Sequence, residues 1–310
     1  MSIPELDGRP VEVTMWARTD TGRTRSENQD TFLLLELRSN EGAAPRTLAP
    51  DTPLEEVGPE GCTFALGSRG ALLLVADGMG GAAGGATASR EGVRRIRDVF
   101  AHGWGEERER TPSQFAAHLA RAVEDANRHL HGIATEHPEY QGMGTTLTAA
   151  GLLDEFVYFA QVGDSRGYLI REGRPVQLTR DQSVVQELVD TGALTEEQAR
   201  RSHQRNVILQ ALGTQATVDV ALTYEELRRG DLVLLCSDGL SGVVEPEEIA
   251  RYAAEYPSPP ELCDALVRLA NERGGPDNIT IAVARLAGPG LRRPSSGEDV
   301  VRRPFSLEAP

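Results

Sequence analysis

Apolar runs of strand length recur along the chain, separated by polar loops and by longer segments of helical period. Residues 11–37 read as two strands joined by a polar loop, because two largely apolar runs flank a segment rich in Thr, Arg, Ser and Asn. Further strands are predicted within 71–78, 145–165, 166–179, 218–227, 231–239 and 278–286. Many antiparallel-looking strands arranged around helices predict an α+β domain built in layers.

Three longer segments have the period of a helix. One is expected from about Ala86 to His102, after a glycine-rich stretch. The segment 111–138 opens with a Thr cap and a Pro at the first helical position, and its apolar residues recur every three or four positions. A third helix is expected within 258–275, and two short helices between 181 and 204.

Two stretches have few core-forming residues. The segment from Arg38 to Arg69 is rich in Pro, Gly and Glu, which predicts an inserted loop or an extended hairpin. The last stretch, 287–310, predicts a disordered tail. One domain is therefore expected from 11 to 286, preceded by an N-terminal segment at 1–10.

The composition of the 310-residue chain is that of a soluble globular protein, with 39% hydrophobic and 25% charged residues. No apolar stretch has the length of a membrane span, and no signal-peptide pattern is visible at the N-terminus. Three widely spaced cysteines, Cys62, Cys236 and Cys263, are typical of reduced thiols and favour a cytoplasmic location. The net charge of −15 argues against a nucleic-acid partner.

Four aspartates stand at the ends of apolar runs: Asp77, Asp164 and Asp238 finish a run, and Asp277 precedes one. Any one of them alone is better explained as a turn residue. Together they favour a metal site, because converging carboxylates repel one another and raise each other's pKa unless a cation holds them ionised. Oxygen ligands without Cys or His suit Mg²⁺ or Mn²⁺ rather than zinc.

Other motifs of enzymes and cofactor sites fail on their chemistry. Residues Gly78–Ala83 match the dinucleotide fingerprint G-x-G-x-x-A, but the charge of Asp77 would oppose a pyrophosphate there. No second strand ending in an acid follows about 20 residues later. The chain has no phosphate-binding Gly-Lys-Ser/Thr and no G-x-S-x-G motif, and its six histidines lack ligand spacing.

Seven motifs between residues 23 and 283 resemble, in order, those of the metal-dependent Ser/Thr protein phosphatases, the phosphatase 2C class in its bacterial form. They are RTRSENQD, VADGMGG, GMGTTL, VGDSRGYL, LTRDQSVVQELVDTGALTEEQARRSHQRNVILQALG, LLCSDGLS and GGPDNITIAV. The resemblance implies a four-layer α-β-β-α sandwich, with two central antiparallel sheets flanked by helices. It also implies hydrolysis of phosphoserine and phosphothreonine in proteins, opposing bacterial Ser/Thr kinases.

The same resemblance implies two tightly bound Mg²⁺ or Mn²⁺ ions and a weaker third. Asp77 would bridge the first two ions, and Gly78 would offer its backbone carbonyl to the second. Asp238 and Asp277 would complete the ligands of the first ion, and Asp164 with Asp238 would form the third site.

Further roles come from the residues around these ligands. Arg25 matches the arginine that grips the substrate phosphate; an arginine alone could equally be an exposed loop cation, but the Asn-Gln-Asp that follows at 28–30 favours the functional role. Asp30 would hold metal-bound waters, and Asn278 would orient a ligand. Arg25, Asp30, Asp77 and Asp238 are thus the expected catalytic residues, and 184–205 resembles the mobile flap beside the substrate cleft.

Three positions depart from the family pattern. Gln29 stands where many members have Glu, so its link to the second ion is expected to run through a water. Met79 stands where animal members have the His proposed as general acid, which leaves protonation of the leaving group to a metal-bound water. Gln182 replaces a His of many bacterial members and cannot act as an acid or base.

The expected mechanism is direct attack by water. A water between two divalent cations becomes hydroxide near neutral pH and attacks phosphorus in line, while the cations and Arg25 neutralise the equatorial oxygens. A catalytically silent phosphoprotein-binding module is disfavoured because all four aspartates are present, and a small-molecule phosphomonoesterase is disfavoured by the long flap. The expected partners are phosphorylated proteins, including Ser/Thr kinases and their substrates. The chain is expected to be a monomer.

Overall fold

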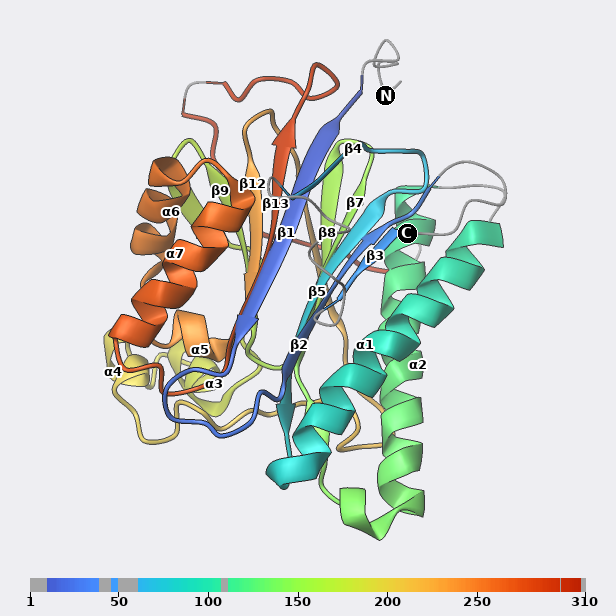
Figure 1. The fold of residues 1–310 in the computed structure, drawn as a ribbon, viewed down its shortest axis with the longest axis vertical. Helices are drawn as coiled ribbons and strands as arrows, with labels where there is room; N and C mark the ends of the chain where they lie inside the picture. Colours follow the sequence, from blue (N-terminus) through green and yellow to red (C-terminus); the bar gives the residue numbers. More distant parts are fainter. Residues whose placement is uncertain (1–9, 39–45, 50–60, 107–110, 296, 308–310) are drawn as a thin grey trace.

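Two antiparallel sheets pack face to face and are covered by helices on both outer sides (Figure 1). The structure is a computed structural model, and it describes residues 10–38, 46–49, 61–106, 111–295 and 297–307. Helices α1 and α2 cover one sheet, and α6 and α7 cover the other. This arrangement confirms the expected four-layer α+β sandwich.

The six-stranded sheet has the order β10-β9-β12-β13-β1-β4, and every pairing in it is antiparallel. Its strands are β1 (Glu12–Asp20), β4 (Cys62–Ala65), β9 (Arg166–Arg171), β10 (Arg174–Gln177), β12 (Leu232–Cys236) and β13 (Ile279–Ala287). The first and last long strands of the chain, β1 and β13, therefore lie side by side near its middle.

The eight-stranded sheet has the order β14-β11-β8-β7-β5-β2-β3, and β6 pairs with the end of β5. Its strands are β2 (Asp30–Glu36), β3 (Arg46–Leu48), β5 (Ala71–Met79), β6 (Gly144–Thr145), β7 (Leu147–Leu153), β8 (Phe156–Val162), β11 (Ala221–Glu226) and β14 (Arg303–Pro304). Strand β5 is buried along its whole length up to Ala76, as its unbroken apolar run requires.

The helices follow from local signals. They are α1 (Gly81–Glu106), α2 (Pro112–Glu136), α3 (Val184–Asp190), α4 (Glu196–Arg200), α5 (Asp238–Ser241), α6 (Pro246–Glu255) and α7 (Pro259–Glu272), with a 3₁₀ turn at Pro138–Tyr140. Thr111 and Gln114 form a capping box at the start of α2, as the sequence predicts. No helix in the described part of the chain has a stretch long and apolar enough to cross a bilayer.

Several predicted elements need correction. Strands β3 and β4 lie within the predicted insertion at 38–69, but they join different sheets and so are not the two arms of one hairpin; residues 39–45 and 50–60 lie outside the described residues. Helix α1 begins at Gly81, earlier than predicted. Helix α6 was not predicted, although Pro246 and the capping box of Glu245 with Glu248 mark its start.

The described residues of the C-terminal stretch are not a disordered tail. Leu291 is 1% exposed within the core between the sheets, and β14 pairs with the edge strand β11. The prediction failed because this stretch has few apolar residues, and its contacts are largely ionic. Residues 308–310 lie outside the described residues, and the domain limits at 11 and 286 stay predictions.

The core between the sheets is the layer on which the fold depends. It joins residues of β5 and β8 to residues of β9, β12 and β13, and the ring of Phe159 is fully buried in it. Phe156, on the same strand, is only partly buried and packs at the margin of the neighbouring cluster under α1 and α2.

We expect Phe159→Ala to lower the free energy of unfolding by about 3–5 kcal/mol, because it removes a fully buried ring and leaves a cavity between two sheets that cannot collapse. The matched variant Phe156→Ala should cost less than half as much. Guanidinium unfolding of both variants measures the difference. Equal losses would mean that the layer between the sheets does not dominate stability.

Candidate metal centre

Strand pairing places Asp30 and Asp77 opposite each other at one end of the eight-stranded sheet. Asp30 begins β2, Asp77 lies near the end of β5, and the two residues are direct partners in the antiparallel register. Asp30 is 5% exposed, and Asp77 is half-buried. Like charges in this position repel unless a cation or a proton lies between them.

The six-stranded sheet contributes Asp238 and Asp277 at the same end of the sandwich. Asp238 opens α5 directly after β12, and Asp277 precedes β13, which pairs antiparallel with β12. The two sheets are linked here by Ser237, whose Oγ donates to Asp30 Oδ2 at 2.7 Å and accepts from the backbone N–H of Thr280 at 3.0 Å. Sequence reasoning missed Ser237, although it stands directly before the predicted ligand Asp238.

The carboxylates at this end perturb one another. Burial raises the pKa of Asp77 well above its usual value, and the charges of Asp30, Asp238, Asp164 and Asp277 raise it further. Burial, reinforced by Asp238 and Asp277, raises the pKa of Asp30 to about 7, although hydrogen bonds to it act in the opposite direction. Burial and the charge of Asp238 raise the pKa of Asp164 to about 7, and burial and Asp277 raise that of Asp238. These predicted site residues therefore lie close enough for their charges to act on one another.

Two buried oxygens in this cluster have no hydrogen-bond partner: Asp30 Oδ1 and Asp238 Oδ1. Orphaned carboxylate oxygens in an all-oxygen set fit a hard divalent cation. Within the described ranges, however, no three His, Cys, Asp or Glu side chains are arranged to hold an ion as they stand. Asp277 Oδ2, an expected ligand oxygen, accepts from Arg25 Nη2 at 2.7 Å.

Arg25 lies on the loop between β1 and β2, and its side chain is 56% exposed. Its pKa is raised, first by the hydrogen bond to Asp277 and also by the charges of Asp238 and Asp77. Arg25 is thus the cation that faces the cluster, and it is exposed enough to contact a ligand from solvent.

Backbone contacts hold the cluster in place. A Cβ at Gly78 would lie 2.1 Å from the carbonyl oxygen of Gly85, so only glycine lets the end of β5 approach α1. The carbonyl of Gln29 accepts from the N–H of Gly78 at 3.2 Å and from Ser89 Oγ at 2.6 Å. Gln29 therefore joins the start of β2 to α1 through its backbone.

Asn278 fixes the loop that carries Arg25. Its Nδ2 donates to the carbonyls of Thr21 and Glu27 at 2.9 Å each, and its Oδ1 accepts from the N–H of Gln29 at 2.8 Å. A Cβ at Gly239 would lie 1.9 Å from the carbonyl oxygen of Asn278, so the chain beside Asp238 is equally tight against this residue.

Two threonines that sequence reasoning did not single out hold the backbone of Asp77. Thr146 N–H and Thr145 Oγ1 donate to the carbonyl of Asp77 at 2.8 and 2.9 Å, and Asp77 N–H donates to Thr146 Oγ1 at 3.1 Å. Both lie in the motif GMGTTL, which was the available signal.

Asp164 is positioned by the segment that leads to the expected flap. Gln182 accepts from the N–H of Gly163 through its Oε1 at 2.8 Å and donates its own N–H to the carbonyl of Gly163 at 2.9 Å. Asp181, one residue before, forms an ion pair with Arg166 at 2.8 Å. The residues on both sides of Asp164 are thus tied to 181–182, and α3 and α4 follow as the two short helices predicted there.

Comparison with known proteins points to one family. The family model described as "Protein phosphatase 2C" matches residues 61–280. The chain is 33% identical over 265 residues to the serine/threonine phosphatase stp of Listeria welshimeri, which covers 85% of this chain and 92% of that protein. It is 40% identical over 213 residues to the serine/threonine protein phosphatase PstP of Mycobacterium tuberculosis, which covers 69% of this chain but only 40% of that longer relative.

Solved structures agree with these sequence matches. The catalytic domain of the serine/threonine phosphatase PstP in complex with two manganese ions matches with a TM-score of 0.69 and 33% identity, over 89% of this chain and 99% of that one. The serine/threonine phosphatase Stp1 of Staphylococcus aureus matches with a TM-score of 0.72 and 31% identity, over 87% and 94% of the two chains.

The raised carboxylate pKa values predict an unusual pH dependence of stability in metal-free protein. A carboxylate whose pKa is higher in the folded than in the unfolded chain stabilises the fold below its unfolded pKa, and this contribution is lost as pH rises through the folded pKa. With folded pKa values near 7 for Asp30 and Asp164, we expect the free energy of unfolding in chelator to fall between pH 5 and pH 8. Each proton that the folded chain binds in excess of the unfolded chain lowers the free energy of unfolding by about 1.4 kcal/mol per unit rise in pH.

Urea unfolding across this pH range measures the effect, and added Mg²⁺ should restore stability mainly at the alkaline end. Asp77→Asn should flatten the profile because it removes a charge from the cluster, whereas Asp264→Asn, at an exposed surface ion pair, should leave it unchanged. Constant or rising stability from pH 5 to pH 8 would contradict the raised pKa values.

Proposed function

Because the chain belongs to the protein phosphatase 2C family, in its bacterial metal-dependent Ser/Thr form, we propose that it hydrolyses phosphoserine and phosphothreonine in proteins at a binuclear Mg²⁺ or Mn²⁺ centre. The observation that carries this proposal is the convergence of Asp30, Asp77, Asp238 and Asp277 from both sheets, with two buried carboxylate oxygens that lack a partner. A manganese-bound structural relative supports the same chemistry.

In this proposal Asp77 would be shared by two ions, the second of which would also use the carbonyl of Gly78. Asp238 and Asp277 would hold the first ion, and Asp164 with Asp238 would hold a weaker third. The support is electrostatic: these carboxylates act on one another's pKa strongly enough that divalent charge would be favoured among them.

Bound cations would lower the pKa of an attacking water and neutralise charge on the phosphoryl oxygens. Asp30 accepts a hydrogen bond from Ser237 on Oδ2, and its Oδ1 has no partner, so Oδ1 can accept a hydrogen bond from that water and orient it. Its pKa near 7 in the metal-free state would fall as positive charge enters the cluster, which keeps it an acceptor at neutral pH.

Arg25 would bind the phosphate. Its exposed guanidinium presents a planar fork to solvent beside the cluster, a geometry that suits two phosphoryl oxygens. Arg25 Nη2 is hydrogen-bonded to Asp277, so in this proposal the side chain has two roles: it would offset the charge of Asp277 and would turn to the phosphate when substrate binds.

No general acid stands at the position after Gly78. Met79 is 37% exposed and carries no proton to donate, so the leaving serine or threonine oxygen takes its proton from water. Gln29 cannot add charge to the second ion, and Gln182 serves as a hydrogen-bonding anchor rather than an acid or base.

The substrate would be a phosphorylated protein. The flap formed by 184–205, with α3 and α4, adds surface beside Asp164 that a small phosphomonoester would not need. We propose that the protein acts as a cytoplasmic monomer on Ser/Thr kinases and their substrates.

We expect turnover of a phosphothreonine peptide to require added Mn²⁺ or Mg²⁺ and to be abolished by excess chelator. Asp238→Asn should lower kcat by at least about a hundredfold, because it removes charge from the ions that generate the nucleophile. Asp264→Asn, a change of the same kind on the outer face of α7, is the matched control. Full turnover in chelator would rule out the metal mechanism, and tight phosphopeptide binding without turnover would favour a silent binding module.

Arg25→Ala should mainly raise KM for the phosphopeptide, by about tenfold or more, since the side chain is proposed to bind phosphate before and during attack. Arg23→Ala removes an exposed arginine from the same loop and should change neither constant. Initial-rate kinetics in saturating Mn²⁺ separate the two constants. A fall in kcat at constant KM would assign Arg25 to the transition state alone.

A further inference from the structure

Residues 288–295 and 297–307, called the strap below, run across the domain after the last strand of the six-stranded sheet. The strap begins beside Pro10, whose carbonyl accepts from the N–H of Gly290 at 3.1 Å. It then follows the turn between β11 and β12, where the carbonyl of Arg292 accepts from the N–H of Arg229 at 2.8 Å. Leu291 is buried in the core between the sheets.

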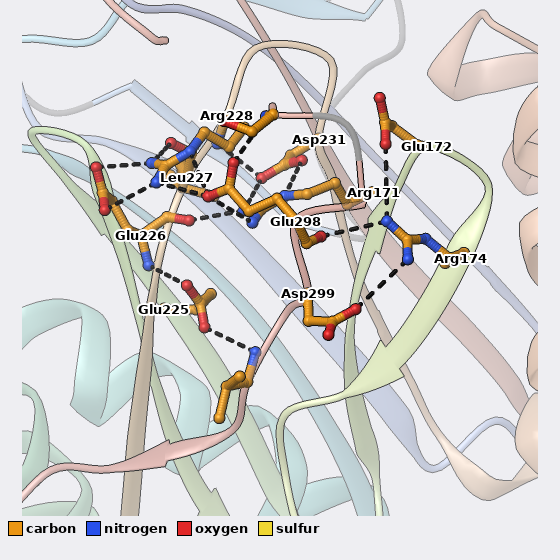
Figure 2. A network of polar contacts seen from close by, with 12 residues as sticks. Arg171, Glu172, Arg174, Glu225, Glu226, Leu227, Arg228, Asp231, Glu298 and Asp299 are labelled. Carbon is orange, nitrogen blue, oxygen red and sulfur yellow. Dashed lines mark hydrogen bonds and ion pairs between the residues drawn. The ribbon is translucent and has the colours of Figure 1, made fainter. Parts of the chain in front are cut away.

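Two buried charges of the domain, Arg171 and Glu225, have ionic partners in the strap, and Figure 2 shows the surroundings of Arg171. The side chain of Arg171 is 1% exposed; Asp231 accepts from its Nε and Nη2, and Glu298 Oε1 lies 3.7 Å from its Nη1. Glu298 also accepts from Arg228 Nε at 2.8 Å. Nη1 of Arg171 makes no hydrogen bond, so Glu298 acts on this buried guanidinium as a nearby negative charge, which lowers the cost of burying it.

Glu225 on the edge strand β11 is the second buried charge, with 3% of its side chain exposed. Its Oε1 pairs with Arg303 Nη1 at 2.6 Å, and its Oε2 accepts from the N–H of Val301 at 3.0 Å, as Figure 2 shows for the latter bond. Both partners belong to the strap. The domain therefore has a buried carboxylate whose ion pair only the strap provides among the described residues.

The strap ends as strand β14 on the open edge of the eight-stranded sheet. Phe305 N–H donates to the carbonyl of Leu222 at 2.9 Å, and its ring packs edge-on against Tyr158 and Tyr224, with centroids at 5.8 and 5.6 Å. This contact covers an edge that would otherwise present unpaired backbone groups.

From this edge the strap reaches the segment that leads to the flap. Arg302 Nη1 donates to the carbonyl of Thr179 at 3.2 Å. Next to it, Thr223 Oγ1 on β11, the strand that β14 pairs with, donates to the carbonyl of Leu178 at 2.8 Å. Residues 181 and 182 follow directly, and they hold Arg166 and Gly163 on either side of Asp164.

We propose that the strap positions the segment 178–182, and through it Asp164 and the flap, with Arg302 as the positioning residue. The ion pairs with Arg171 and Glu225 fix the strap. The segment is then held by two consecutive carbonyls, that of Leu178 through Thr223 of β11 and that of Thr179 through Arg302 of the strap. The effect on catalysis rests on the proposed function, but the effect on local order does not.

The test is amide hydrogen exchange of the metal-free full-length protein, comparing Arg302→Ala with the unmodified chain. We expect amides of residues 179–190 to exchange about fivefold faster, the factor for loss of one exposed charge-assisted hydrogen bond, with β12 and β13 unchanged. Arg302→Lys keeps a cationic donor and should restore slow exchange. Arg293→Ala removes an exposed charge from the same strap and is the matched control.

A second variant, Phe305→Ala, loosens the strap at its other anchor and should speed exchange in 179–190 as well. In Mn²⁺ titrations of phosphopeptide turnover, Arg302→Ala should raise the half-saturating Mn²⁺ concentration about threefold while kcat at saturation is kept. Unchanged exchange at 179–190 in Arg302→Ala would overturn the proposal, and so would uniformly faster exchange with a lower unfolding midpoint. If the unmodified protein has no phosphatase activity, the proposed function fails while the exchange result still decides the role of the strap.

Discussion

Like charges must be held together at one end of the sandwich, and the local structure there follows from that constraint. Strand register sets Asp30 against Asp77, and the antiparallel pairing of β12 with β13 brings Asp238 to the same end as Asp277. In water such carboxylates would separate. Here their backbones are fixed by pairings inside two packed sheets, so burial and, after it, mutual repulsion raise the pKa of Asp77. A cation relieves it, which is the physical basis of metal dependence.

The contacts around the cluster resist this repulsion by tying separate elements together. Ser237 links the two sheets through Asp30, Asn278 fixes the loop that carries Arg25, and Gly78 lets β5 approach α1 too closely for any side chain. Arg25 donates a hydrogen bond to Asp277 and offsets part of its negative charge. A single exposed arginine can therefore contact Asp277 and remain available for a phosphate, since its hydrogen bond to Asp277 is at the surface.

Charged side chains also hold the C-terminal strap against the rest of the protein. The strap has few apolar residues, yet Glu298 and Arg303 complete ion pairs with Arg171 and Glu225, whose side chains are buried. Removing one member of such a pair leaves an uncompensated charge in the protein interior. The described C-terminal residues thus pack against the sheets partly through ion pairs, and hydrophobicity alone is a poor guide to their contacts.

The sequence by itself determined the long strands, most helices and the aspartates at the strand ends, because these depend on local periodicity and on residue chemistry that is visible in short motifs. Only the tertiary structure decided what depends on distant partners. Asp277 is paired with Arg25 across 252 positions, and Arg302 reaches Thr179 across 123. The strands β3 and β4 separate into different sheets for the same reason. A polar residue looks the same in the sequence whether it faces solvent or a buried opposite charge, and only folding brings that charge to it.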